Sequence, residues 1–144
     1  MRSAVFLAAI SFCVPASALD EVEIAKRAKN DLAIEYAECG AYFAVVAEGM
    51  RRSLPEGTAK DKDIANWQKF SGGAFKLASA LRSEERTIAV AKQTTENIKR
   101  MINNSYENLA VAADEYGYRC KDLIEDPKAR TQYWIDKERS AAPR

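Results

Sequence analysis

Apolar residues recur along most of this chain at alternating spacings of three and four, and no other feature restricts its fold as strongly. This spacing places side chains on one face of an α-helix, whereas a half-buried strand alternates at every second residue. The first stripe predicts a helix from residue 30 or 31 to residue 54, which a further apolar pattern extends back toward Asp20. Pro55 and Gly57 are expected to end it. The stripe consists of Leu32, Tyr36, Cys39, Phe43, Val46, Met50 and Leu54.

A second helix is predicted over residues 61–81, with Asp61 or Asp63 as its N-cap. Its stripe consists of Ile64, Trp67, Ser71, Ala74, Ala78 and Leu81, with Phe70, Phe75 and Leu77 nearby. A ridge of small residues on the first helix would let it approach closely: Ala33, Ala37, Gly40, Ala44 and Ala47. Gly72 and Gly73 each cost about 1 kcal/mol relative to alanine inside a helix. They indicate a kink, a close helix contact or a break, and we favour a continuous or kinked helix.

The third helix is expected to be the longest. Ser83 is a suitable N-cap, and Glu84 and Glu85 suit the positive end of the helix dipole. Cys120 continues the buried face if the helix passes through Gly117. The stripe keeps its alternation for four heptads, as in a helix packed nearly antiparallel in a bundle. It runs through Ile88, Ala91, Thr95, Ile98, Ile102, Ser105, Leu109, Ala112 and Tyr116.

The C-terminal part begins with Asp126 and Pro127, an N-cap followed by proline at the first helical position. They predict a short helix that carries Ala129, Tyr133, Trp134 and Ile135, followed by a frayed polar tail over residues 137–144. The sequence has no strand-like alternation bounded by turn signals and no glycine-rich phosphate loop. The expected fold is all-α: a single domain over residues 19–144, built as a bundle of four or five helices.

The first 18 residues have the pattern of a secretory signal peptide. Arg2 supplies a positive start, residues 4–14 form an apolar run, and residues 16–18 form a small-x-small cleavage signal. We predict cleavage after Ala18, which leaves 144 − 18 = 126 residues in the periplasm or outside the cell. The apolar run is shorter than the roughly 20 residues that span a bilayer. An uncleaved anchor is therefore the less favoured alternative, and no stable membrane insertion is expected after cleavage.

Removal of this leader would leave two cysteines, Cys39 and Cys120, in an oxidising compartment. Such a pair predicts one intramolecular disulfide. The bridge would join the middle of the first helix to the end of the third. A thiol-exchange site is disfavoured because the chain has no Cys-x-x-Cys motif and no histidine to activate a thiolate. We therefore expect the bridge to be structural.

The composition excludes several functional classes. The chain after Ala18 carries 21 basic and 21 acidic side chains, since Arg2 is the only charge before it. This balance gives no electrostatic footprint for nucleic acid. Histidine is absent, which excludes Ser-His-Asp and Cys-His catalysis and histidine-ligated zinc or haem. No cofactor is expected.

Paired carboxylates occur at four places: Glu35/Glu38, Asp61/Asp63, Glu84/Glu85 and Asp114/Glu115. Two carboxylates that converge in a cleft can perform acid–base or glycosidase chemistry. Charges spaced this closely are more often a solvated helix face or a helix start, which is the interpretation we favour. No calcium loop or Glu-x-x-His motif is present, so no metal site is expected.

Aromatic residues near the cysteines are expected chiefly to pack the disulfide and the adjoining core. The alternative is a partner-binding patch, and the candidate residues near the cysteines and the C-terminus are Tyr42, Tyr118, Tyr133 and Trp134. Tyr42 and Tyr118 lie off the main stripes, so we expect both to be exposed. Tyrosine and tryptophan are enriched at interface hot spots. Trp134 is expected either to dock on the bundle, which we favour, or to present an apolar anchor to a partner.

These features favour a small exported helical protein that acts by binding another protein of its compartment. Inhibitors, immunity factors, chaperone-like proteins and subunits of envelope complexes all have this character. A carrier of a small apolar ligand between helices is the alternative, suggested by the small-residue ridge and by Gly72-Gly73. A carboxylate-dependent enzyme is the third hypothesis, and the overall expectation is a protein that is not an enzyme.

Overall fold

The computed structural model describes residues 16–53 and 58–142, and this part of the chain contains helices and turns but no strand. The three N-terminal helices are α1 (Ala16–Ser53), α2 (Thr58–Leu81) and α3 (Glu84–Met101). A single 3-10 turn, η1 (Tyr106–Asn108), leads into α4 (Leu109–Ala112), a π-helical turn η2 (Ala113–Gly117) and α5 (Tyr118–Glu125). The last helix is α6 (Pro127–Ala141). Because α4, η2 and α5 are continuous, the described residues form five rods, which confirms the all-α expectation.

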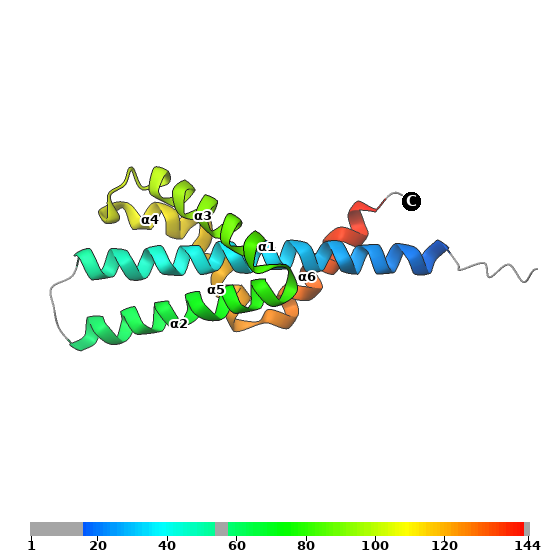
Figure 1. Ribbon diagram of the computed structural model, residues 1–144, viewed down its shortest axis with the longest axis horizontal. Coiled ribbons are helices and arrows are strands. Elements are labelled where there is room, and N and C mark those ends of the chain that lie inside the picture. The colour runs from blue at the N-terminus through cyan, green and yellow to red at the C-terminus, as the bar shows by residue number, and fades with distance from the viewer. Residues whose placement is uncertain (1–15, 54–57, 143–144) are drawn as a thin grey trace, which may run out of the picture.

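The longest helix, α1, is the axis of the molecule (Figure 1). It has 38 residues, or about 57 Å at 1.5 Å per residue. On one side lies α2, on the other lie α3 and α4, and α6 runs along the N-terminal half of α1 (Figure 1). The predicted stripe of α1 is confirmed as its buried face at Leu32, Tyr36, Cys39 and Phe43. Leu54, Pro55 and Gly57 lie outside the described residues.

Gly40 is the point of close approach between α1 and α2. A Cβ at this residue would lie 2.6 Å from Cε1 of Phe75, so only glycine admits the ring. The Ser71 hydroxyl donates a hydrogen bond of 2.9 Å to the Gly40 carbonyl. The predicted small-residue ridge is thus confirmed here, except that Ala44 is exposed.

The second helix begins at Thr58, so Asp61 and Asp63 lie inside it. The prediction that one of them is the N-cap was wrong; Asp61 instead faces the positive end of the helix dipole from the first turn. The helix is continuous through Gly72 and Gly73, as favoured. A Cβ at either glycine would meet nothing within 4 Å. The close helix contact that Gly72 and Gly73 suggested is therefore not made by them; α1 and α2 approach each other closely at Gly40 of α1.

The expectation of one long third helix was wrong, because α3 ends at Met101. Asn103 and Asn104 have positive φ angles of 52° and 55°. The Asn104 amide donates to the Lys99 carbonyl and the Asn103 amide to the Arg100 carbonyl, which together form a Schellman C-cap with asparagine in the place of the usual glycine. Ser83 is confirmed as the N-cap, since its hydroxyl accepts from the Arg86 amide.

The predicted buried face of this region is correct in part. Ile98, Ile102, Ala112, Tyr116 and Cys120 are buried. Ile88 is 59% exposed and Thr87 is buried instead. The Thr87 hydroxyl donates to the Ser83 carbonyl, so its burial leaves no unpaired polar group.

Cys39 and Cys120 form the predicted disulfide, with a Cα–Cα distance of 5.4 Å. Both are fully buried. The bridge joins the middle of α1 to α5.

The last helix starts as predicted. The Asp126 carboxylate accepts from the Ala129 amide at 2.9 Å, and Pro127 occupies the first position. The helix continues to Ala141, and the expected fraying over residues 137–144 stays a prediction. Arg139 forms an ion pair with Glu21 of α1 at 3.0 Å, which gives the last turns a partner.

The predicted cleavage site after Ala18 lies in the first turn of α1. Nothing in the structure tests cleavage, so it stays a prediction, and residues 1–15 lie outside the described part of the chain. No helix in the described part is long and apolar enough to cross a membrane.

Candidate partner-binding surface

A second apolar stripe runs along the exposed face of α2. It occurs at spacings of 3, 4 and 3, one residue before the buried stripe, at Phe70, Gly73, Leu77 and Ala80. All four are exposed, Phe70 at 39% and Leu77 at 48%. Successive residues are about 100° apart around a helix. One face of α2 therefore packs on α1, and a neighbouring apolar face, the seam, has no cover in the described part of the chain.

The seam forms one wall of a groove, and α5 forms the other. Two adjoining pockets of about 280 and 340 Å³ share Phe43, Phe70 and Ile124 as lining residues. Ile124 of α5 is 40% exposed. The second pocket extends past Gly73 and Leu77 to Pro127. We call this continuous depression the α2–α5 groove.

Aromatic packing holds the wall of the groove at Phe70. The Phe70 ring lies 5.9 Å from the ring of Phe43 and 6.1 Å from that of Trp67. Phe43 and Trp67 also contact each other at 5.5 Å. Rings at these separations attract one another beyond the burial of their surface. Phe70 is therefore held in place by these two rings, while 39% of the residue stays exposed to solvent.

The predicted aromatic residues do not form one cluster. Tyr42 is only 6% exposed, so the expectation that it is exposed was wrong. Its ring stacks on Tyr116 at 5.8 Å, and burial raises its pKa above the ordinary value of 10.0. It contributes to the floor of the α2–α5 groove. Tyr118 is 78% exposed, as expected.

Tyr133 and Trp134 lie together on α6, with ring centroids 5.4 Å apart. Tyr133 is 46% exposed, and the Arg130 guanidinium lies 4.3 Å from its ring centroid. Trp134 is half-buried, and its indole nitrogen donates to the Glu35 carboxylate at 2.6 Å. Trp134 thus docks on the bundle, as favoured.

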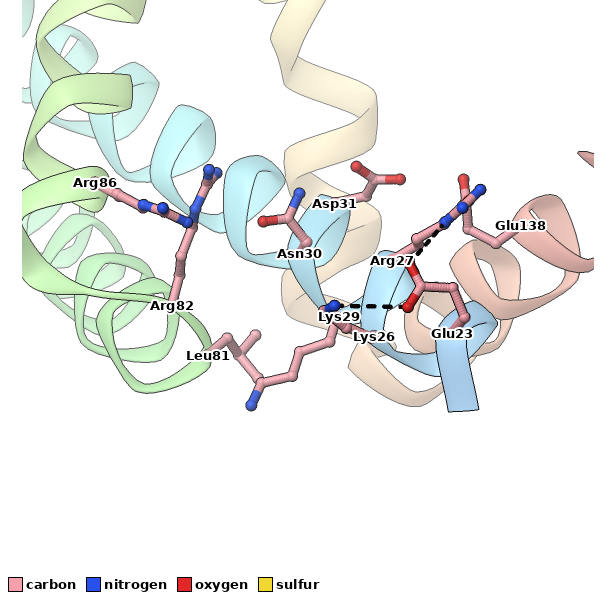
Figure 2. A pocket seen from close by; sticks show the side chains of 10 residues that line it. All are labelled: Glu23, Lys26, Arg27, Lys29, Asn30, Asp31, Leu81, Arg82, Arg86 and Glu138. Carbon is pink, nitrogen blue, oxygen red and sulfur yellow. Dashed lines mark hydrogen bonds and ion pairs between the residues drawn. The ribbon is translucent and has the colours of Figure 1, made fainter. Parts of the chain in front are cut away.

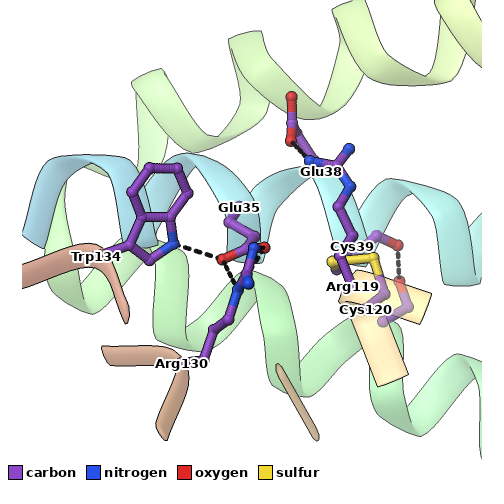
Figure 3. The surroundings of a disulfide bond; sticks show 9 residues. Glu35, Glu38, Cys39, Arg119, Cys120, Arg130 and Trp134 are labelled. Atoms are coloured by element: carbon purple, nitrogen blue, oxygen red, sulfur yellow. Dashed lines mark hydrogen bonds and ion pairs between the residues drawn. A yellow bond between two sulfur atoms is a disulfide. The ribbon is translucent and has the colours of Figure 1, made fainter. Parts of the chain in front are cut away.

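The expectation of a solvated face was wrong for Glu35, which is 1% exposed. Arg130 Nε donates to both carboxylate oxygens at 2.9 Å. Its carboxylate partner raises the pKa of Arg130, which therefore stays charged. Glu38 instead pairs with Arg119 at 2.7 Å, and its carboxylate points away from that of Glu35 (Figure 3). Each carboxylate is held by its own arginine, and the Glu35 cluster fastens α6 to α1.

Another pocket, of about 510 Å³, lies where α1 meets the α2–α3 corner and α6 (Figure 2). Its lining includes five basic and three acidic side chains. Glu23 is paired with Lys26 at 3.5 Å and with Arg27 at 3.2 Å. Arg82 lines it too, and its Nε is buried without a hydrogen-bond partner. Because charges of both signs are mixed, the pocket favours no single class of ligand.

The apolar seam of α2 is the feature that the sequence prediction missed. The signal was the 3-4-3 repeat through Phe70, Gly73, Leu77 and Ala80. The exposed stripe has the same spacing as the buried stripe of α2, so the sequence alone does not show which of these two stripes packs against α1. In the described residues, no group of three or more histidine, cysteine or acidic side chains is placed to hold a metal ion.

Comparisons with known proteins identify no relative. No protein-family model matches the sequence, and no curated protein or solved structure matches it. Function is therefore inferred from the residues of this chain.

Proposed function

We propose that the protein acts by binding a helix of another protein in the α2–α5 groove. The observation that carries this proposal is the exposed apolar seam of α2, Phe70 to Leu77, facing Ile124 of α5. Exposed apolar surface arranged in this way is typical of interaction sites. The proposal keeps the expected class, an exported binding protein such as an inhibitor or a subunit of an envelope complex.

The shape of the groove favours a helix as the occupant. Phe70 and Leu77 are seven residues apart, so they lie about 10 Å from each other along α2. This separation matches two turns of a partner helix, which would insert anchors at a similar spacing. Gly73 lies between the two, and a Cβ there would have open space around it. Since no side chain stands at this point, a partner backbone can come close to α2.

The other two hypotheses receive less support. A carrier was suggested by the small-residue ridge and by Gly72-Gly73. Phe75 fills the space beside Gly40 of the ridge, and Gly73 lines the α2–α5 groove, whose walls at Leu77 and Ile124 are exposed to solvent. A carboxylate-dependent enzyme would need two free carboxyl groups that converge, whereas Glu35 and Glu38 are each paired with an arginine.

Photo-crosslinking in the cell that makes the protein tests this proposal. A photoreactive amino acid is placed at Leu77 in the groove or at Val111 on α4, a matched control because both residues are 48% exposed. We expect a crosslinked partner from position 77 and none from position 111. The crosslinked peptide of the partner should lie in an amphipathic helix. Equal crosslinking at both positions, or none at position 77, contradicts the proposal.

A further inference from the structure

Two lysines flank the apolar seam of α2. Lys69 and Lys76 each directly precede an apolar seam residue, Phe70 and Leu77. Both lysines are exposed, and neither forms an ion pair with another described residue. From Ile64 to Leu81, the sequence of α2 carries no other charge. This flank of the α2–α5 groove is therefore purely basic.

The opposite rim does not offset these charges. Its charged residues in the groove are Lys121 and Glu125 of α5, which pair with each other at 3.8 Å. The acidic residues of α2, Asp61 and Asp63, lie one turn or more before the seam. The two edges of the groove taken together therefore carry a net positive charge, which comes from Lys69 and Lys76 beside the seam.

When two helices pack along 3-4 spaced seams, the residues beside the seam face the flank of the partner helix. Opposite charges there determine which partner is accepted. Resting on the function proposed above, we propose that the occupant of the groove is a helix with an acidic flank. Its acidic residues would be spaced about seven apart beside an apolar face, so that they meet Lys69 and Lys76.

The same flank disfavours a second copy of this chain as the occupant. If two copies of α2 packed antiparallel along the seam, Lys69 and Lys76 of one copy would face the same lysines of the other. Like charges in this arrangement are repulsive and act against self-association.

Three synthetic helical peptides of about 21 residues test the inference on the disulfide-intact protein. The first has leucines at 3-4 spacing with glutamate on its flanks, and the second has the same leucines with lysine on its flanks. The third keeps the composition of the first but has its leucines scattered around the helix. We expect the glutamate peptide to bind about five- to tenfold more tightly than the lysine peptide, and added salt to reduce this preference. The scattered peptide should not bind.

Charge reversal supplies the decisive comparison. The double variant Lys69→Glu/Lys76→Glu should reverse the preference, so that the lysine peptide binds more tightly. The control Lys29→Glu/Lys92→Glu makes the same change of net charge at two exposed lysines outside the groove. It should keep the original preference.

The outcomes separate this inference from the proposed function. If both leucine-seam peptides bind equally and Leu77→Glu abolishes binding of both, the acidic-flank inference is wrong and the groove still binds helices. If neither peptide binds, or if Leu77→Glu changes nothing, the proposed function fails as well. If sedimentation shows a dimer that Leu77→Glu dissociates, the occupant is a second copy and the inference is overturned.

Discussion

Glu35 places a carboxylate inside the protein, where a charge is costly unless it is paired and hydrogen-bonded. Arg130 and Trp134 of α6 meet this need from residues 95 and 99 positions further along the chain. Nothing near Glu35 in the sequence indicates these partners. For this reason local spacing predicted a solvated face.

Replacement of Arg130 by methionine should reduce the free energy of unfolding by about 3 kcal/mol, because it leaves the buried Glu35 carboxylate without its cation. Urea denaturation followed by circular dichroism measures this loss. Arg139→Met, which removes the exposed ion pair with Glu21, is the control and should change stability little. The double variant Glu35→Gln/Arg130→Met should recover part of the loss. If Arg130→Met lowers the free energy of unfolding as little as Arg139→Met does, the Glu35 cluster does not stabilise the fold.

Three tyrosines should make the protein less stable at alkaline pH. Burial raises the pKa of Tyr36, Tyr42 and Tyr116 above the ordinary value of 10.0, and the charges of Glu35 and Glu38 add to the effect at Tyr36 and Tyr116. Above pH 10 the unfolded chain loses phenolic protons that the folded chain retains, so the free energy of unfolding decreases as the pH rises. Below that pH these groups contribute no pH dependence.

Urea denaturation at several pH values between 9 and 11.5 measures this slope. Tyr42→Phe should reduce it, because one of the three phenols is removed. A slope that is unchanged by Tyr42→Phe would show that this phenol does not contribute.

At the scale of elements, the glycines of α1 and α2 lie in two contrasting environments. Gly72 and Gly73 of α2 face open space, whereas Gly40 of α1 lies against the Phe75 ring. Gly72→Ala and Gly73→Ala should each stabilise the protein by about 0.5–1 kcal/mol, because alanine favours the helix and its methyl group meets open space. Gly40→Ala on α1 should destabilise it by about 1–3 kcal/mol, because the methyl group would overlap the Phe75 ring. Thermal denaturation of the three variants checks the opposite signs. A stable Gly40→Ala variant would mean that Phe75 can move aside without cost.

Element boundaries could be predicted where a chemical signal marks them. Ser83 and the Asp126-Pro127 pair were recognised as helix starts because capping depends on adjacent residues. The end of α3 was missed because the apolar alternation continues across the turn, from Ile98 and Ile102 to Leu109. A Schellman cap formed by Asn103 leaves that spacing intact, so the pattern showed no break.

The same limit applies to the candidate site. Sequence spacing predicted the buried stripe of α2 and noted Phe70 and Leu77 near it. The exposed seam could not be distinguished, because its partner wall, Ile124, lies more than 40 residues away. Tyr42 was expected outside for a related reason: its cover, Tyr116, belongs to a distant segment.

At the scale of the whole molecule, the disulfide connects segments 81 residues apart. The double variant Cys39→Ala/Cys120→Ala should lose about 4–5 kcal/mol of stability, the loop-closure entropy of a chain segment of this length. Urea denaturation of the variant checks this value, and the natural chain unfolded with a reductant should behave in the same way. If neither treatment lowers the denaturation midpoint, packing alone holds α5 against α1.

Cys39 and Gly40 are consecutive residues of α1, and each joins this helix to a different wall of the α2–α5 groove. Cys39 is bonded to α5, while Gly40 receives Phe75 and the Ser71 hydroxyl of α2. Both walls are thus positioned from one point on the backbone, so the width of the groove is set before a partner arrives. A helix that enters it meets walls already at their final separation, and association loses little conformational entropy on the side of this protein.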